Sequence, residues 1–189
     1  HNKSNAIIAN ECIETAIELI KKNKYSNLVT APISKEGFKK AGFKFTGHTP
    51  LLQSIFKSKN ASMAFYSKTL KIVLATIHIP LSSVETSLTN TCILNTIENA
   101  KIFANKVNIL NPRIAIAGLN PHAGENGQIG TFEKSVLEPL ITQYNNNHSV
   151  KIAGPISPDI VFQQANNNKY DIVIALYHDQ GLIPLKLIN

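Results

Sequence analysis

Apolar and polar residues follow two different periods along the chain. Apolar residues recurring every three or four positions predict helices over residues 5–23, 48–59, 82–106 and 131–144, and from residue 158. Short, mostly apolar runs predict buried strands at 28–31, 70–76, 113–118 and 171–177, and a weaker run predicts one at 151–153. Strands that are apolar on both faces and separated by helices are typical of a parallel or mixed sheet with helices on both faces. We therefore expect an α/β fold.

Capping signals indicate where two of these helices begin. Ser82 and Glu85 have the spacing of a capping box, which predicts one long helix running to Lys106. Ser157, followed by Pro158 at the first helical position, predicts the start of another.

The composition is that of a folded protein, with 43% hydrophobic and 16% charged residues in a chain of 189. No apolar run approaches the roughly 20 residues that a membrane span requires. The first residues show no signal-peptide core. We expect a soluble cytoplasmic protein without a membrane partner.

The net charge of +7 comes almost entirely from lysine, and Arg113 is the only arginine. The lysines are scattered, without the basic stripe and interleaved aromatic residues of a nucleic-acid surface. The charge pattern therefore argues against a nucleic-acid partner and suits a small phosphorylated or carboxylated substrate.

The cysteines, Cys12 and Cys92, fall among apolar residues of predicted helices, so we expect buried, unpaired thiols.

Three histidines follow three predicted strands: His78, His122 and His178. Ligands of open α/β sheets bind beyond the carboxyl ends of the strands. If these strands are parallel neighbours, the three imidazoles share one edge of the sheet. Imidazole is the commonest metal ligand, and three protein ligands with an open position define a catalytic site. Nitrogen ligands suit zinc, cobalt or nickel. Taken singly, each histidine has the alternative of a structural or solvent-exposed ring.

A second candidate site lies where a loop turns into a helix at His48 and Thr49. Amides at a helix N-terminus attract anions, and an imidazole beside them favours a phosphate or carboxylate. The alternative is that Thr49 simply caps a helix that begins at Pro50.

Other polar residues near these histidines have two interpretations each. Asp179 either orients the neighbouring His178 or caps a turn. Lys186 either contacts an anionic substrate or lies on the surface. The glycine-rich segment 123–130 is a weak dinucleotide signal and fits tight turns around His122. We expect His148, in a polar loop, to be solvated.

Five segments resemble one family closely and in order along nearly the whole chain: TGHT at 46–49, ATIHIPL at 75–81, GLNPHAGENGQIG at 118–130, GPISPD at 154–159 and YHDQGLIPLK at 177–186. They are similar to the 4-hydroxythreonine-4-phosphate dehydrogenases of pyridoxal phosphate biosynthesis. Pro50 is a departure, because the family often has an acidic residue after GHT.

The resemblance implies an isocitrate/isopropylmalate dehydrogenase-like fold, with two α/β lobes around a cleft, in an obligate homodimer. It implies that His78, His122 and His178 bind a divalent metal (zinc, magnesium or cobalt) that both protomers share. It also implies that His48, Thr49 and Lys186 contact the phosphorylated substrate. No general base is assigned; Asp179 is a candidate.

By the same resemblance, residues 1–189 form the central part of such an enzyme, incomplete at both ends. The boundary between the lobes is not resolved by the sequence. The contacts to NAD are expected mainly beyond Asn189.

The implied reaction is the NAD-dependent oxidation of 4-phosphooxy-L-threonine at C3, followed by decarboxylation to 3-amino-2-oxopropyl phosphate. One alternative is a related dehydrogenase acting on threonate or erythronate 4-phosphate. Others are a metal-dependent hydrolase or aldolase without a nicotinamide, and an inactive metal-binding dimerisation fragment.

Overall fold

The computed structural model describes residues 2–25, 27–45, 47–58 and 61–188, and the chain divides between residues 59 and 60 into two compact units. Unit 1 precedes this point and unit 2 follows it. Each unit is described by itself.

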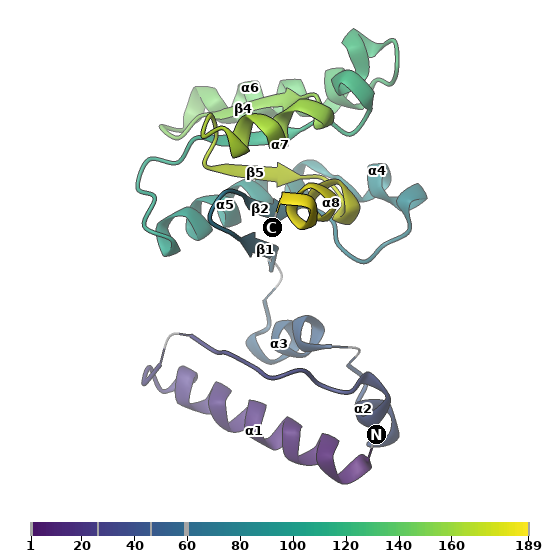
Figure 1. The fold of residues 1–189 in the computed structure, drawn as a ribbon, viewed down its shortest axis with the longest axis vertical. Helices are drawn as coiled ribbons and strands as arrows, with labels where there is room; N and C mark the ends of the chain where they lie inside the picture. Colours follow the sequence, from purple (N-terminus) through teal and green to yellow (C-terminus); the bar gives the residue numbers. More distant parts are fainter. Residues whose placement is uncertain (1, 26, 46, 59–60, 189) are drawn as a thin grey trace. The chain divides into compact units, whose positions relative to one another are not determined.

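The described residues of unit 1 form the helices α1 (Lys3–Lys21), α2 (Lys35–Lys40) and α3 (His48–Phe56) (Figure 1). The side chain of Asn2 caps α1 and that of Ser34 caps α2. The buried face of α1 packs with the other two helices in one apolar cluster that includes Ile17, Phe38 and Leu51.

The strand predicted at 28–31 is wrong. This segment is extended but has no strand partner among the described residues, and Val29 is 96% exposed. A β-strand is stabilised by hydrogen bonds to a neighbour, so an apolar run alone does not form one.

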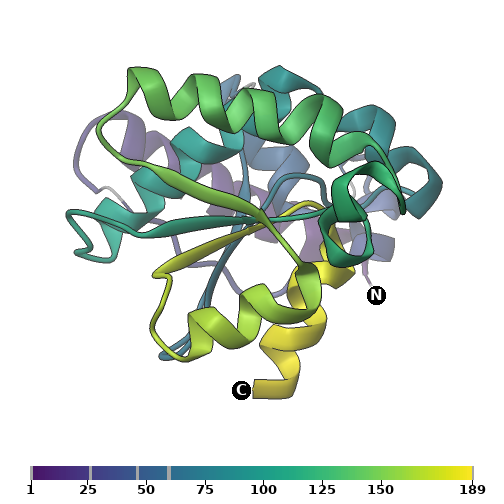
Figure 2. The same ribbon diagram turned by 90° about the horizontal axis from the view of Figure 1, so that it is seen from above.

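Unit 2 is built on a five-stranded sheet with the order β1-β2-β5-β3-β4. The strands are β1 (Met63–Tyr66), β2 (Lys71–Leu74), β3 (Ile114–Ala117), β4 (Ile152–Ile156) and β5 (Ile172–Ala175). β1 is antiparallel to β2, and the other four strands are parallel (Figure 2). The predicted parallel or mixed sheet is confirmed, and β1 was missed.

Helices cover both faces of this sheet. Helices α5 (Asn90–Lys106) and α6 (Glu138–Asn147) lie on one face, and α7 (Pro158–Asn166) and α8 (His178–Ile188) lie on the other (Figures 1 and 2). In β5, Ile172 and Ile174 pack toward α5 and α6, whereas Val173 and Ala175 pack toward α7 and α8. Successive strand residues point to opposite faces, so both faces require apolar residues.

The long helix predicted over 82–106 is broken. A 3₁₀ turn (Leu81–Ser83) and the short helix α4 (Val84–Ser87) precede α5. Thr89 is the N-cap of α5, and its hydroxyl accepts a hydrogen bond from the Cys92 N–H. The predicted capping box at Ser82 therefore does not cap α5.

The start predicted at Ser157 is confirmed, because α7 begins at Pro158. The Ser157 hydroxyl donates to the Asp159 carboxylate instead of capping the helix. A one-turn π-helix (Glu133–Leu137) precedes α6.

The prediction that Cys12 is buried is wrong. The buried positions of α1 are Ala6, Asn10, Ile13 and Ile17, and Cys12 is one residue, or about 100° of helix rotation, away from Ile13. Cys92 is half-buried, and burial raises the pKa of its thiol. Both thiols are free.

In the described residues, no helix is long and apolar enough to cross a bilayer.

Candidate functional site

Three neighbouring parallel strands carry the three histidines at their carboxyl ends. β5 lies between β2 and β3, so these ends meet at one edge of the sheet. His78 is four residues after β2, His178 three after β5 and His122 five after β3. The strand arrangement on which the predicted convergence depends is therefore present.

Two of these imidazoles lie side by side. The ring centres of His78 and His178 are 5.4 Å apart, and both residues line a hollow of about 490 Å³. Two imidazoles bound tetrahedrally to one zinc ion have ring centres roughly 5 Å apart. The spacing and the nitrogen donors of this pair fit a shared divalent metal.

Asp179 engages the second ring directly. Its Oδ1 lies 2.7 Å from Nδ1 of His178. A carboxylate on one ring nitrogen fixes the orientation of an imidazole and leaves the other nitrogen for a ligand. This contact matches the orienting interpretation of Asp179.

His122 reaches the same edge on the loop that follows β3, and its side chain is exposed. It lies near Asp159: the pKa of Asp159 is lowered, first by the Ser157 hydroxyl and also by the charge of His122. Within one copy of the chain, no three histidine, cysteine or acidic side chains of the described residues form a metal-binding group. His122 therefore lies at the edge but apart from the other two rings.

Buried polar side chains tie these strand ends together. The Thr76 hydroxyl and N–H both donate to the Leu176 carbonyl, at 2.7 and 3.1 Å. Gln180 accepts from the Leu176 N–H and donates to the Gly118 carbonyl, both at 2.7 Å. β5 is thus connected to the loops that carry His78 and His122. Neither residue was predicted from the sequence, because the signal for each is merely a polar side chain beside a buried strand end.

In unit 1, α3 begins at His48, with Gly47 at the N-cap position and no side-chain cap. The alternative in which Thr49 caps a helix starting at Pro50 is therefore wrong. The His48 Nε2 atom is buried without a hydrogen-bond partner in the described residues. A helix N-terminus without a side-chain cap, beside an unpaired imidazole nitrogen, suits an anion.

Lys186 is exposed on α8, eight residues after His178 and about 12 Å farther along the helix axis. It lies on the same helix as a candidate metal ligand but on a different turn.

His148 is exposed as expected, and its ring stacks on Tyr144 with 3.9 Å between ring centres.

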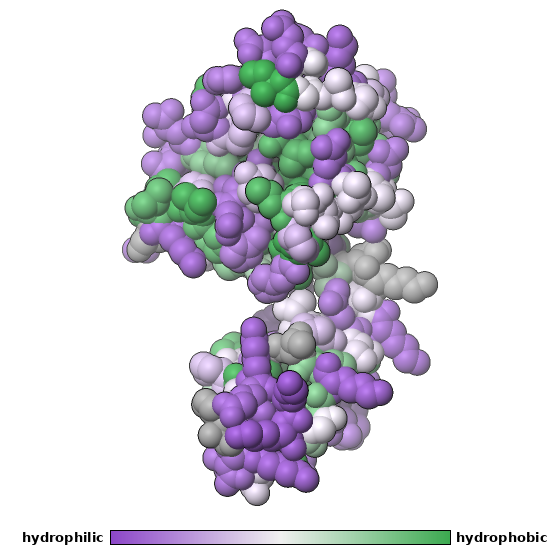
Figure 3. All heavy atoms as spheres, turned by 90° about the vertical axis from the view of Figure 1, so that its right-hand side faces the viewer, coloured by the Kyte–Doolittle hydropathy of each residue, from purple (hydrophilic) through white to green (hydrophobic). Residues whose placement is uncertain are grey.

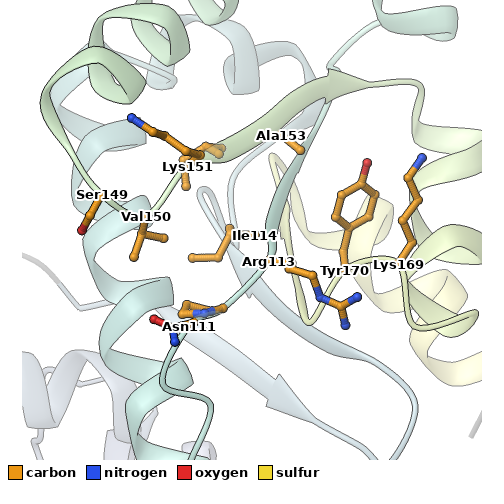
Figure 4. A pocket seen from close by; sticks show the side chains of 11 residues that line it. Asn111, Arg113, Ile114, Ser149, Val150, Lys151, Ala153, Lys169 and Tyr170 are labelled. Atoms are coloured by element: carbon orange, nitrogen blue, oxygen red, sulfur yellow. The ribbon is translucent and has the colours of Figure 1, made fainter.

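A larger hollow of about 630 Å³ lies at the opposite edge of the sheet, where loops enter β3, β4 and β5. Figure 4 shows that the charged ends of Arg113, Lys151 and Lys169 point away from one another. Arg113 also pairs with Asp171 at 2.7 Å. Cations that diverge do not form an anion site, so the histidine edge remains the candidate site.

Apolar side chains are exposed beside the histidine pair. Leu81 is 71% exposed and Ile79 is 38% exposed, and both line the same hollow as His78. Apolar areas also appear on the face of unit 2 in Figure 3, whereas the face of unit 1 seen there is mostly hydrophilic. An apolar rim around a polar site is typical of a surface that another molecule covers.

Comparison with known proteins identifies the family. Residues 1–189 match the family described as pyridoxal phosphate biosynthetic protein PdxA. A D-threonate 4-phosphate dehydrogenase from Salmonella typhimurium is 40% identical over 182 residues, which are 96% of this chain and 55% of that protein. A 4-hydroxythreonine-4-phosphate dehydrogenase from Desulforapulum autotrophicum is 40% identical over 178 residues, 94% of this chain and 52% of that protein.

A solved structure supports the same family assignment. The 4-hydroxythreonine-4-phosphate dehydrogenase of Klebsiella pneumoniae superposes with a TM-score of 0.92 at 37% identity, covering 100% of this chain and 56% of that one. The chain thus spans about half the length of these relatives. The matches confirm the expected α/β architecture of the isocitrate dehydrogenase type. The chain belongs to the PdxA family of pyridoxal phosphate biosynthetic proteins.

Proposed function

We propose that the protein is a metal-dependent, NAD-linked dehydrogenase. It oxidises 4-phosphooxy-L-threonine at C3, and the product loses carbon dioxide to give 3-amino-2-oxopropyl phosphate. The observation that carries this proposal is that His78, His178 and His122 follow the carboxyl ends of three adjacent parallel strands. The names of the relatives support the reaction.

In this proposal, His78, His122 and His178 hold a divalent cation such as zinc, magnesium or cobalt. Three neutral imidazoles leave the charge of the ion intact, so that it supplies a Lewis acid for an alcohol and then for a ketone. Asp179 holds His178 through Nδ1 and is thereby an orienting group more than a free base.

The anionic end of the substrate is assigned to His48, Thr49 and Lys186. In unit 1, the Nε2 of His48, which has no described partner, and the first amides of α3 are candidate donors; in unit 2, Lys186 of α8 is a candidate cation. Removing the charge of Lys186 should raise KM more than it lowers kcat, because a phosphate remote from C3 is bound alike before and during the reaction.

A second copy of the chain completes the metal site. Two ligands are adjacent within one copy, and the third lies apart from them at the same edge. The exposed Leu81 and Ile79 supply an apolar rim that a second copy would cover. We propose a homodimer in which His122 of one protomer serves the histidine pair of the other.

The test is NAD reduction by the purified protein with 4-phosphooxy-L-threonine, before and after removal of divalent metal. The proposal predicts activity that is lost with a chelator and restored by zinc or cobalt. His178→Ala should abolish it, and His148→Ala should not. NAD reduction that persists fully in metal-free protein would contradict the assignment, and so would the absence of NAD reduction by a full-length protein that includes the NAD contacts expected beyond Asn189.

The second candidate is oxidation of D-threonate 4-phosphate, which the name of the Salmonella relative supports at the same identity. The two substrates differ at C2, with an amino group in one and a hydroxyl in the other. The kcat/KM ratio for the two compounds under identical conditions decides between them.

A further inference from the structure

We propose that Glu133 is a positioning residue, whose buried carboxylate fixes the backbone that carries His122. The inference rests on the proposed metal-binding role of His122. Glu133 is 1% exposed and begins the π-helical turn before α6. A buried carboxylate is costly unless hydrogen bonds compensate for its lost hydration, so its partners reveal what it organises.

All three hydrogen bonds described for this carboxylate come from the loop that carries His122. Oε1 accepts from the N–H groups of Leu119 and Asn120, both at 2.7 Å. Oε2 accepts from the Asn120 side-chain amide at 2.9 Å. The anchored residues are two and three positions before His122, and bonds to a carboxylate are stronger than neutral ones.

The glycines of the loop allow the backbone to close around this anchor. A Cβ on Gly124 would lie 2.7 Å from Glu133 Oε2, and one on Gly118 would lie 3.2 Å from Oε1. Gly130 would likewise collide with the Asn120 side chain. The glycine-rich segment therefore encloses a carboxylate of its own chain.

The segment 122–126 shows why an anchor is required. His122, Ala123, Gly124, Glu125 and Asn126 all have positive φ, between 42° and 77°. Left-handed conformations are unfavourable for residues with a Cβ and persist only where the surroundings impose them. The His122 ring is exposed, so burial does not hold it in place. Its position depends on the backbone, and Glu133 holds that backbone.

The matched variants are Glu133→Ala and Glu133→Gln. The alanine variant removes both carboxylate oxygens that accept hydrogen bonds from the loop. The glutamine variant keeps one oxygen for both backbone N–H groups, and its amide can pair with Asn120 if that side chain turns its oxygen inward. Asn120→Ala in the glutamine background removes this compensation.

Cobalt(II) binding to metal-free protein is the readout, followed by its visible absorption and by calorimetry, with thermal unfolding of the same samples. Glu133→Ala should weaken cobalt binding roughly 10- to 100-fold, as loss of a group that orients a metal ligand does. Glu133→Gln should bind within about threefold of the wild type, and adding Asn120→Ala should weaken it again. Amide exchange at Leu119 and Asn120 should accelerate in the same order.

Each other outcome overturns the inference. Glu133→Ala with reduced stability but wild-type cobalt affinity would make Glu133 structural only. If Glu133→Ala does not fold, wild-type affinity in the folded Glu133→Gln, Asn120→Ala double variant has the same consequence. Cobalt binding that His122→Ala leaves unchanged would instead refute the proposed function itself.

Discussion

At the residue scale, buried and hydrogen-bonded polar side chains support the histidine edge. Thr76 and Gln180 connect the strand ends through the backbone of Leu176 and Gly118. The rings themselves are exposed or half-buried. The histidine edge therefore combines accessible rings with a buried hydrogen-bonded support, which is how a rigid position and access to solvent coexist.

Gln180 gives a direct test of this support. Gln180→Ala leaves the Leu176 N–H and the Gly118 carbonyl without their partner in a buried place, and should cost roughly 2 kcal/mol of unfolding free energy. Gln163→Ala, on the exposed side of α7, should change it by less than about 0.5 kcal/mol. Urea denaturation measures both, and equal values would exclude the bridging role.

The ion pair between Asp171 and Arg113 makes the free energy of unfolding depend on pH. The side chain and the backbone N–H of Arg113 donate to the Asp171 carboxylate, which holds its pKa below the ordinary value. The stabilisation is therefore present above the unfolded-state pKa of about 4 and is lost as pH falls through the lower folded-state value. Asp171→Asn should cost roughly 1 kcal/mol at pH 7.

The difference between the wild type and Asp171→Asn should vanish at low pH. Unfolding followed by circular dichroism from neutral pH into the acid range measures it. A difference that remains constant over this range would show that the ionised carboxylate does not contribute.

At the scale of elements, α8 must lie directly on the sheet to present His178 at the strand edge. Gly181 makes this approach close: a Cβ there would be 2.9 Å from Leu74 and 3.0 Å from Ile72. The helix that begins at His178 is thus packed against β2 as well as β5.

Gly181→Ala should destabilise the protein by roughly 1 to 3 kcal/mol, because a methyl group has no space between helix and sheet. Gly37→Ala in α2 is the matched control, since its Cβ would meet neighbours only at 3.4 Å. It should be nearly neutral, because alanine favours a helix. Thermal unfolding compares them, and equal shifts would argue against close packing of α8.

Elements with a strong local pattern were predictable, and those defined by partners were not. β3 and β5 are buried at every position and were found, whereas β1 is alternately half-buried and exposed and is recognisable mainly through its pairing with β2. The run at 28–31 looked equally apolar but has no described partner strand. The break before α5 was missed because Thr89 caps as well as the earlier Ser82 was expected to.

At the scale of the whole molecule, the sequence predicted which residues share an edge but not what supports them. Three histidines after three buried strands were sufficient, because parallel strands end at one edge. Glu133 and Gln180 were not predicted from the sequence, because their roles depend on contacts with Asn120 and Gly118, which are 13 and 62 positions away. Such long-range pairs leave no local pattern.

Sharing of the site between protomers can be tested by mixing two inactive variants. His78→Ala and His122→Ala should each lose the metal as homodimers. A mixed dimer, purified through two different tags, keeps one of its two sites intact if His122 serves the partner. It should regain about half of the wild-type metal content and activity. Sites contained within one chain would leave the mixed dimer without metal.

We propose that His78, His122 and His178 bind one divalent cation, and a zinc titration of metal-free protein by calorimetry is the decisive experiment. The wild type should bind one ion per chain. His122→Ala and His178→Ala should each weaken binding by more than the roughly 10- to 100-fold that loss of an orienting group costs, while His148→Ala should bind as the wild type does. Unchanged affinity in either of the first two variants would contradict the account.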